Sequence, residues 1–172
     1  MFDISNAVAY DNSMVFGTPE RKPIPIPESA WIDVKSDVSS GHWIPREGEM
    51  VRTVLQQLIR LSVSPEDIFM LTPFRDCERK LWPIARSFGI KKFGTVHKSQ
   101  GKEFDIVLFI LGGDPSRPGA KSWAAQKPNL VNVAVSRARR RLYIIGDYQS
   151  WHDRPNFRVC AEQLPRVKGL KI

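Results

Sequence analysis

The chain has 172 residues, of which 42% are hydrophobic and 26% are charged, a size and composition that suit one globular domain with a full core. No apolar run is long enough to cross a bilayer, and the N-terminus carries no basic region followed by an apolar stretch, so we expect neither a membrane span nor a secretory signal. The formal net charge of +8 suits a polyanionic partner, although solubility alone would also account for it.

The cysteines and histidines show no metal-ligand spacing. Cys77 and Cys160 are far apart in the sequence, and His42, His97 and His152 are equally scattered. We therefore expect no metal site and no disulfide framework, and we expect a reducing cytoplasm (or the nucleus, in a eukaryote) as the setting.

Short apolar runs alternate with helical patterns along the chain. In chain order, the expected strands are Met14–Phe16, Trp31–Val34, Ile68–Leu71, Lys92–Val96, Ile106–Leu111 and Leu142–Ile145. Four helices are expected. The first has Val51, Val54, Leu55, Leu58 and Ile59 on one face, and the second covers Glu78–Phe88 and bends or breaks at Pro83. The third contains Leu130, Val133, Ala134 and Ala138, and a closing helix lies near Val159–Leu164.

This alternation predicts an α/β fold with a mostly parallel central sheet. The apolar runs Ile68–Leu71 and Ile106–Leu111 are continuous rather than alternating, which suits strands buried on both faces. Because ligands of such sheets gather beyond the C-termini of the strands, we expect Thr72–Arg75, His97–Glu103 and the region of Asp147 to share one functional edge.

Two stretches break the pattern. Thr18–Pro27 contains four prolines, which exclude a helix, and Gly112–Pro128 is rich in glycine, proline and alanine and is expected to form a long surface loop. Within it, Gly113–Ser122 resembles a phosphate-binding loop, but Ala120 separates the second glycine from the lysine that should follow it directly. We therefore expect no phosphate-binding loop in this chain.

The most informative polar stretch is Gly94–Asp105, between two expected strands. Thr95 and Ser99 supply hydroxyl groups, Gly101 permits close approach of the backbone to a ligand, and backbone amides at a helix start can hold a phosphate. An ordinary capped turn explains the same composition, so both interpretations stay open at this stage.

A second stretch, Asn129–Gly146, is a helix that leads into a strand. Four arginines gather where the helix is expected to end: Arg137, Arg139, Arg140 and Arg141. Arg137 and Arg141 are one helical turn apart and are expected to share a face. Cations here complement the helix dipole, which is worth ~0.3–1 kcal/mol for each, but four of them suggest anion binding or a subunit interface as well.

A third stretch, Asp67–Arg75, is a buried strand that delivers Thr72, Phe74 and Arg75 to an edge of the sheet. Phe74 could stack on a base, and Thr72 or Arg75 could hold a phosphate. The alternative is an ordinary strand-ending turn with Phe74 in the core.

In order and spacing, these three stretches resemble the C-terminal half of the superfamily 1 helicase core, specifically its branch B. The matching segments are Thr95–Glu103 (TVHKSQGKE) to motif V, Asn132–Arg139 (NVAVSRAR) to motif VI, Leu71–Arg75 to the segment that precedes a helix in this branch, and Met1–Val15 to the stretch after the motif IV arginine. The resemblance covers residues 1–150 and implies a RecA-like, P-loop NTPase-type three-layer domain there. Residues 151–172 are then expected to be a C-terminal tail that packs on this domain or extends it.

The resemblance also implies roles for individual residues. Arg137 matches the motif VI arginine finger, the catalytic residue that reaches the γ-phosphate of ATP, and Glu103 matches the motif V glutamate expected on the ribose. The other implied nucleotide contacts are Gly101, beside the phosphates, and Gln100, between the two ligands. The implied contacts to a single strand are Thr95, His97 and Ser99, with Thr72 as a further candidate.

The sequence lacks the phosphate-binding loop and the acidic magnesium motif, which the family keeps in its first RecA-like domain. We therefore expect the chain to be part of a longer protein and inactive alone, with ATP and Mg²⁺ bound only together with that upstream domain. The expected partner is single-stranded DNA or RNA, with the 5′-to-3′ movement usual in this branch. The motif IV arginine would lie before Met1, and Cys77 stands where the branch often has glutamine, which weakens that segment as a contact site. The alternative is a stand-alone nucleic-acid-binding or regulatory module without ATPase activity, which would need neither Glu103 nor Arg137.

Overall fold

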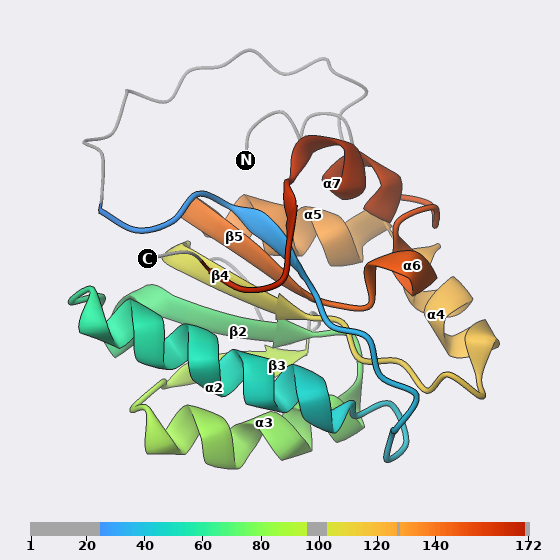
Figure 1. Cartoon of the computed structure of the whole chain (residues 1–172), viewed down its shortest axis with the longest axis horizontal. Coiled ribbons are helices and arrows are strands. Elements are labelled where there is room, and N and C mark those ends of the chain that lie inside the picture. Colours follow the sequence, from blue (N-terminus) through green and yellow to red (C-terminus); the bar gives the residue numbers. More distant parts are fainter. Residues whose placement is uncertain (1–24, 96–102, 127, 171–172) are drawn as a thin grey trace.

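A parallel sheet forms the centre of the molecule (Figure 1). The computed structural model describes residues 25–95, 103–126 and 128–170. All neighbouring strands of the six-stranded sheet are parallel, in the order β3-β2-β4-β5-β1-β6. The strands are β1 (Ala30–Asp33), β2 (Ile68–Thr72), β3 (Lys92–Thr95), β4 (Phe104–Ile110), β5 (Ala138–Gly146) and β6 (Arg166–Val167). The predicted α/β fold with a parallel, RecA-like sheet is confirmed, and the predicted strand Met14–Phe16 lies outside the described residues.

Helices cover both faces of the sheet and give the domain three layers (Figure 1). The first face is covered by α2 (Pro45–Arg60) and α3 (Arg75–Ser87). The second face is covered by α4 (Pro118–Ala125), α5 (Pro128–Arg137), α6 (Tyr148–Trp151) and α7 (Phe157–Gln163). A short 3₁₀ helix, η1 (Pro65–Asp67), leads into β2.

The sheet separates two apolar cores. In β4, Val107 and Phe109 belong to the core under α5 and α7, whereas Ile106, Leu108 and Ile110 belong to the core under α2 and α3. Successive side chains of a strand point to opposite faces, so a strand covered on both faces must be apolar throughout. This burial explains the continuous apolar run that the sequence shows at β4.

Two predicted features of the helical layers need correction. α3 continues through Pro83 to Ser87, so the helix does not break at the proline, because Leu81, Ile84 and Ala85 on either side of it are buried and hold the helix against the sheet. The stretch Gly112–Pro128, expected as a surface loop, contains α4. Ala124 and Ala125 of α4 are fully buried, so long-range packing stabilises a helix that local composition did not favour.

The C-terminal residues belong to the same sheet and core. α7 confirms the helix predicted near Val159–Leu164, and it buries Phe157 and Cys160 completely. β6, which the sequence did not predict, pairs in parallel with β1, where Trp31 lies opposite Arg166. Among the described residues, no helix has the length and apolar character that a membrane span requires.

Candidate functional site

The pairing of β4 with β5 brings Glu103, the last residue of the motif V-like segment, to the end of the motif VI-like segment. Phe104 lies opposite Ala138, so the residues just before the two strands, Glu103 and Arg137, reach the same N-terminal edge of the sheet. Glu103 Oε2 accepts a hydrogen bond from Arg139 Nε at 3.1 Å. This N-terminal edge therefore combines a carboxylate and guanidinium groups from two segments that are more than 30 residues apart in sequence.

Arg140 and Arg141 are also paired with carboxylates of the same chain. The register of the two strands shifts between Phe104 and Ile106, and Asp105 Oδ2 accepts a hydrogen bond from Arg140 Nε at 3.1 Å. Arg141 donates to Glu28 Oε1 and to the carbonyl oxygen of Pro27, both at 2.9 Å. These intrachain contacts weaken the subunit-interface interpretation of the arginine cluster, because Arg139, Arg140 and Arg141 each have a carboxylate partner in their own chain.

The prediction that Arg137 and Arg141 share a helix face is wrong. α5 ends at Arg137, and Ala138 already belongs to β5. The strand conformation is imposed by pairing with β4, which overrides the helical pattern of the local sequence.

The C-terminal edge of β2 and β3 holds the remaining described candidates. Thr72 lies opposite Thr95, and both side chains are buried, with 0% and 5% of their surface exposed. Arg75, the first residue of α3, is exposed at this edge. Phe74 is 6% exposed and its ring stacks on the ring of His42 with centroids 4.2 Å apart. The core interpretation of Phe74 is therefore the one that the structure favours, since the ring is covered by a neighbouring loop.

The expectation of a single functional edge is wrong for Glu103. Thr95 ends β3 at the C-terminal edge, whereas Glu103 precedes β4 at the N-terminal edge. The physical reason is that two parallel strands need a crossover that carries the chain back to the other edge of the sheet. The candidates His97, Ser99, Gln100 and Gly101 lie outside the described residues.

The loop before α2 packs against the C-terminal end of β4, beside β2. β2 leads to α3 on one face and β4 leads to α4 and α5 on the other, which makes this the switch point where open α/β sheets usually bind ligands. Here the carbonyl oxygen of His42 accepts hydrogen bonds from the Gly113 amide at 2.8 Å and from Cys77 Sγ at 3.1 Å. Gly112 has a φ of +58°, and a Cβ there would lie 2.5 Å from the same oxygen. The loop before α2 thus occupies part of the usual ligand crevice.

Beside this crevice lies a buried acid, Glu47, that no pattern of the sequence indicated. Glu47, at the start of α2, is 1% exposed, and its Oε2 accepts a hydrogen bond from the Gly112 amide at 2.8 Å. Burial raises the pKa of Glu47 to about 8, although the Gly112 amide and the nearby Lys121 oppose this shift. Burial also lowers the pKa of Lys121, which lines the same small cavity of about 140 Å³ as Asp147. No sequence signal announces this cluster, because its members come from three separate elements.

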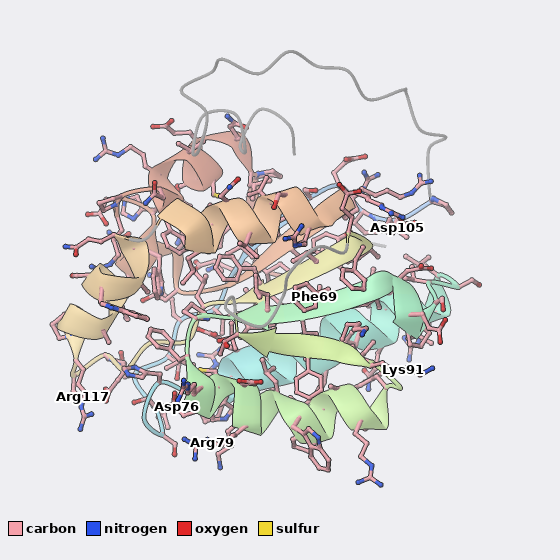
Figure 2. All side chains as sticks on the ribbon, turned by 180° about the vertical axis from the view of Figure 1, so that it is seen from behind. Phe69, Asp76, Arg79, Lys91, Asp105 and Arg117 are labelled. Atoms are coloured by element: carbon pink, nitrogen blue, oxygen red, sulfur yellow. The ribbon has the colours of Figure 1, made fainter. Side chains whose placement is uncertain are left out.

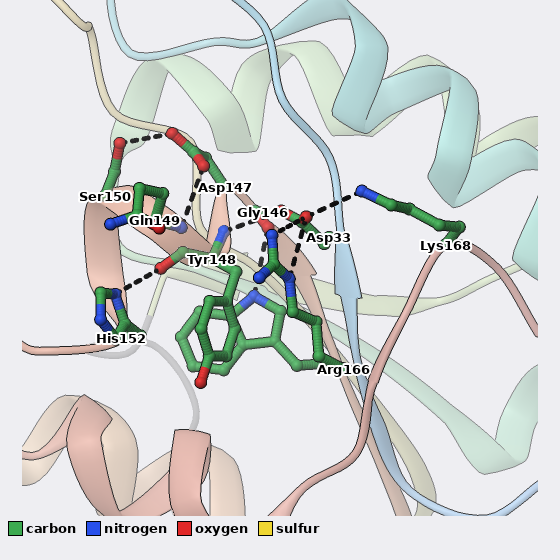
Figure 3. Close-up of polar contacts among 10 residues, drawn as sticks. Asp33, Gly146, Asp147, Tyr148, Gln149, Ser150, His152, Arg166 and Lys168 are labelled. Atoms are coloured by element: carbon green, nitrogen blue, oxygen red, sulfur yellow. Dashed lines mark hydrogen bonds and ion pairs between the residues drawn. The ribbon is translucent and has the colours of Figure 1, made fainter.

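Asp33 anchors the C-terminal segment to β1 (Figure 3). Its Oδ2 accepts hydrogen bonds from Arg166 Nη2 at 2.7 Å and Lys168 Nζ at 3.0 Å, and its Oδ1 accepts one from the Tyr148 amide at 3.0 Å. Burial alone would raise the pKa of Asp33, but these hydrogen bonds outweigh burial and hold the pKa below its ordinary value. In the part of the chain that the structure describes, no group of three His, Cys, Asp or Glu side chains is arranged to hold a metal ion.

Comparison with known proteins supports the helicase resemblance of the sequence. These features define a helicase domain of the superfamily 1 type, and residues 12–149 match a protein family described as AAA domain. Since this match covers most of the chain, the chain belongs to that family.

Several relatives are named as helicases or contain related regions. The chain is 36% identical over 111 residues to "NFX1-type zinc finger-containing protein 1" of Mus musculus, which covers 63% of this chain and 6% of that protein. It is 34% identical over 113 residues to "3'-5' exoribonuclease HELZ2" of Homo sapiens, covering 58% of this chain and 4% of that protein. It is 31% identical over 114 residues to "DNA polymerase alpha-associated DNA helicase A" of Schizosaccharomyces pombe, covering 64% of this chain and 16% of that protein. The chain therefore spans only a small part of the length of these relatives.

Proposed function

We propose that this chain acts as the second RecA-like motor domain of an ATP-dependent superfamily 1 helicase and contributes half of the ATPase site. The observation that carries the proposal is the pairing of Phe104 with Ala138, which brings Glu103 and Arg137 to one edge. A guanidinium at such a site stabilises charge on the transferring phosphoryl group and is worth ~10³–10⁵ in rate. Arg137 is proposed as this arginine finger.

Glu103 suits the proposed ribose contact. Its carboxylate is paired with Arg139, but the two side chains are 48% and 47% exposed. An exposed ion pair of this kind contributes ~0–1 kcal/mol, so hydroxyl groups of a ribose can replace it at small cost. Gly101 and Gln100 are proposed as further nucleotide contacts on the basis of the motif V resemblance alone.

The proposed site is complete only with a second domain. The sequence contains no lysine-bearing phosphate-binding loop, and the one acidic residue of the motif V-like and motif VI-like segments, Glu103, is proposed for the ribose and not for a magnesium ion at the phosphates. We therefore propose that an upstream RecA-like domain of the same protein supplies both, and that the chain alone does not hydrolyse ATP. The proposed setting is the cytoplasm, or the nucleus in a eukaryote.

Single-stranded DNA or RNA is the proposed second ligand. Arg75, His97 and Ser99 are its proposed contacts, and the net charge of +8 favours a polyanion. Thr72 and Thr95, whose side chains are buried, are proposed as contacts on the basis of the resemblance alone. Thr95 and Glu103 lie at opposite edges of the sheet but are only eight positions apart, so one short segment would link the strand site to the nucleotide site. Nucleotide can drive movement only through different affinities for two states of the cleft, and such a segment would be a direct route for that coupling.

The decisive experiment replaces Arg137 with alanine in the complete protein. Turnover of ATP should fall by ~10³-fold or more, while binding of a single-stranded oligonucleotide stays within a few-fold of the wild type. Arg158→Ala, an exposed arginine on α7, is the matched control and should leave both quantities unchanged. Turnover that survives Arg137→Ala would refute the arginine-finger role.

The alternative function is nucleic-acid binding without ATPase activity, which the net charge of +8 also favours. This alternative predicts salt-dependent binding of oligonucleotides together with no turnover in the complete protein. Nucleotide-dependent changes in strand affinity of the complete protein would exclude it.

A further inference from the structure

The outer face of α3 carries a stripe of arginines around a tryptophan. Arg75, Arg79, Trp82 and Arg86 are spaced four, three and four residues apart, so they lie along one side of the helix. All four are exposed, and half of the Trp82 surface is accessible, at 50%. The opposite side of α3, which includes Leu81 and Ile84, is buried against the sheet. We call the four residues the α3 stripe.

The α3 stripe borders a wide groove at the rim of the sheet. Arg75, Arg79 and Trp82 line this groove of about 750 Å³ together with Glu78 and with Phe93 of β3. β3 is an edge strand, so the groove is open toward solvent on the outer side of the molecule. Figure 2 shows α3 on the outer surface, with Arg79 near its first turn.

The stripe combines the two chemistries that single-stranded nucleic acid requires. Arg86 Cζ lies 5.3 Å from the centroid of the Trp82 ring, a cation–π contact that holds the indole on the surface. Aromatic rings stack on unpaired bases, and neighbouring arginines contact the phosphates. Two arginines, Arg75 and Arg79, and one acid, Glu78, line the groove. Arg86 adds a third positive charge on the same side of α3, so this surface is positive and complements a polyanion.

The α3 stripe is also continuous with the proposed strand contacts. Arg75 follows Thr72 by three residues and begins α3 at the C-terminal edge, where Thr72 pairs with Thr95. From there the stripe extends about 16 Å along the helix axis, at ~1.5 Å per residue. A strand leaving the C-terminal edge would therefore meet Arg79 and then Trp82.

We propose that the α3 stripe is an additional binding surface for single-stranded nucleic acid, on which a base stacks against Trp82 while Arg75 and Arg79 contact the phosphates. This inference rests on the proposed function, because it extends the path of the strand that the motor domain would bind. It assigns a role to Trp82 and Arg79, which no motif of the sequence indicated.

The test measures binding of fluorescein-labelled single-stranded oligonucleotides, oligo-dT and oligo-U of equal length, to the full 172-residue chain by anisotropy at low salt. Trp82→Ala should weaken binding by ~5- to 100-fold, and Trp82→Phe should restore most of the affinity, because a ring that stacks is retained. Arg79→Ala should reduce the salt dependence of binding, lowering the slope of log K against log salt by ~0.7. Comparison of the two oligonucleotides shows whether the surface prefers DNA or RNA.

Matched controls are available on other helices. Trp123→Ala removes a tryptophan of α4 that is 45% exposed, and Arg158→Ala removes an exposed arginine of α7. Equal affinities for the wild type, Trp82→Ala and Arg79→Ala would overturn the α3 stripe as a nucleic-acid surface, point to a protein partner there, and leave the proposed function standing. If the wild-type chain bound neither oligonucleotide, the strand-binding part of the proposed function would fail together with this inference.

Discussion

Replacing Glu47 with glutamine should remove a pH-dependent loss of stability. The carboxyl of Glu47 has an ordinary pKa of 4.5, and burial raises the pKa to about 8 in the folded chain. Between these two values the unfolded chain carries the ionised form and the folded chain the protonated form, so unfolding releases a proton. The free energy of unfolding therefore falls as the pH rises through this window, with the stabilising contribution complete below pH ~4.5 and lost above pH ~8.

The magnitude follows from the size of the shift. Each pKa unit corresponds to ~1.4 kcal/mol, so the full window is worth on the order of 5 kcal/mol. Glutamine is neutral at every pH and keeps an oxygen that can accept the hydrogen bond of the Gly112 amide, which Glu47 accepts at 2.8 Å. Glu47→Gln should therefore match the wild type near pH 5 and exceed its stability increasingly toward pH 9.

The assay is urea unfolding at pH 5, 7 and 9, followed by tryptophan fluorescence. Trp31 and Trp151 are fully buried and report loss of the core. Glu49→Gln, an exposed position of the same helix, is the control and should follow the wild-type curve. A stability difference between Glu47→Gln and the wild type that stays constant from pH 5 to pH 9 would show that Glu47 is ionised in the folded chain and refute the reasoning.

Two further substitutions test the packing of the chain, both by urea unfolding. Asp33→Asn removes the charge of a carboxyl whose pKa is lowered in the folded chain, so it should lower the free energy of unfolding by ~1–3 kcal/mol at neutral pH. This difference from the wild type should shrink as the pH falls below ~4, because the wild-type carboxyl is then protonated. An undiminished difference at pH 3 would contradict this ion-pair role. Gly112→Ala should cost at least ~1–3 kcal/mol, because the residue has a φ of +58° and a new Cβ would lie 2.5 Å from the His42 carbonyl oxygen. Gly119→Ala in α4, where a Cβ meets nothing within 4 Å, should be neutral or stabilising, and equal losses at both glycines would argue against the clash.

Much of the fold was accessible from the sequence. β2 and β4 contain continuous apolar runs, as does the second half of β5 at Leu142–Ile145, and burial on both faces of a parallel sheet requires such runs. The motif segments were equally visible, because their residue types and spacing are local. The strands and motifs that were predicted are those whose defining residues are close neighbours in the sequence.

The errors share one cause, which is the influence of distant residues. α4 forms inside a stretch rich in glycine and proline because Ala124 and Ala125 are buried in the core. The helical pattern around Arg137 stops because Ala138 pairs with Phe104 of β4. Phe74, which local sequence left open between a base contact and the core, stacks on His42 from the loop before α2.

The sequence by itself determined the class of fold, the family and the residue types at the candidate nucleotide and strand sites. Only the tertiary structure decided which edge of the sheet each residue reaches, placing Glu103 with Arg137 at one edge and Thr72 with Thr95 at the other. Strand order is set by long-range packing of the crossover helices on the two faces, and no short segment contains that information. The burial of Glu47 and the exposure of Trp82 follow from the same packing. In other surroundings a glutamate would be exposed and a tryptophan would be buried, so the residue type alone does not decide either.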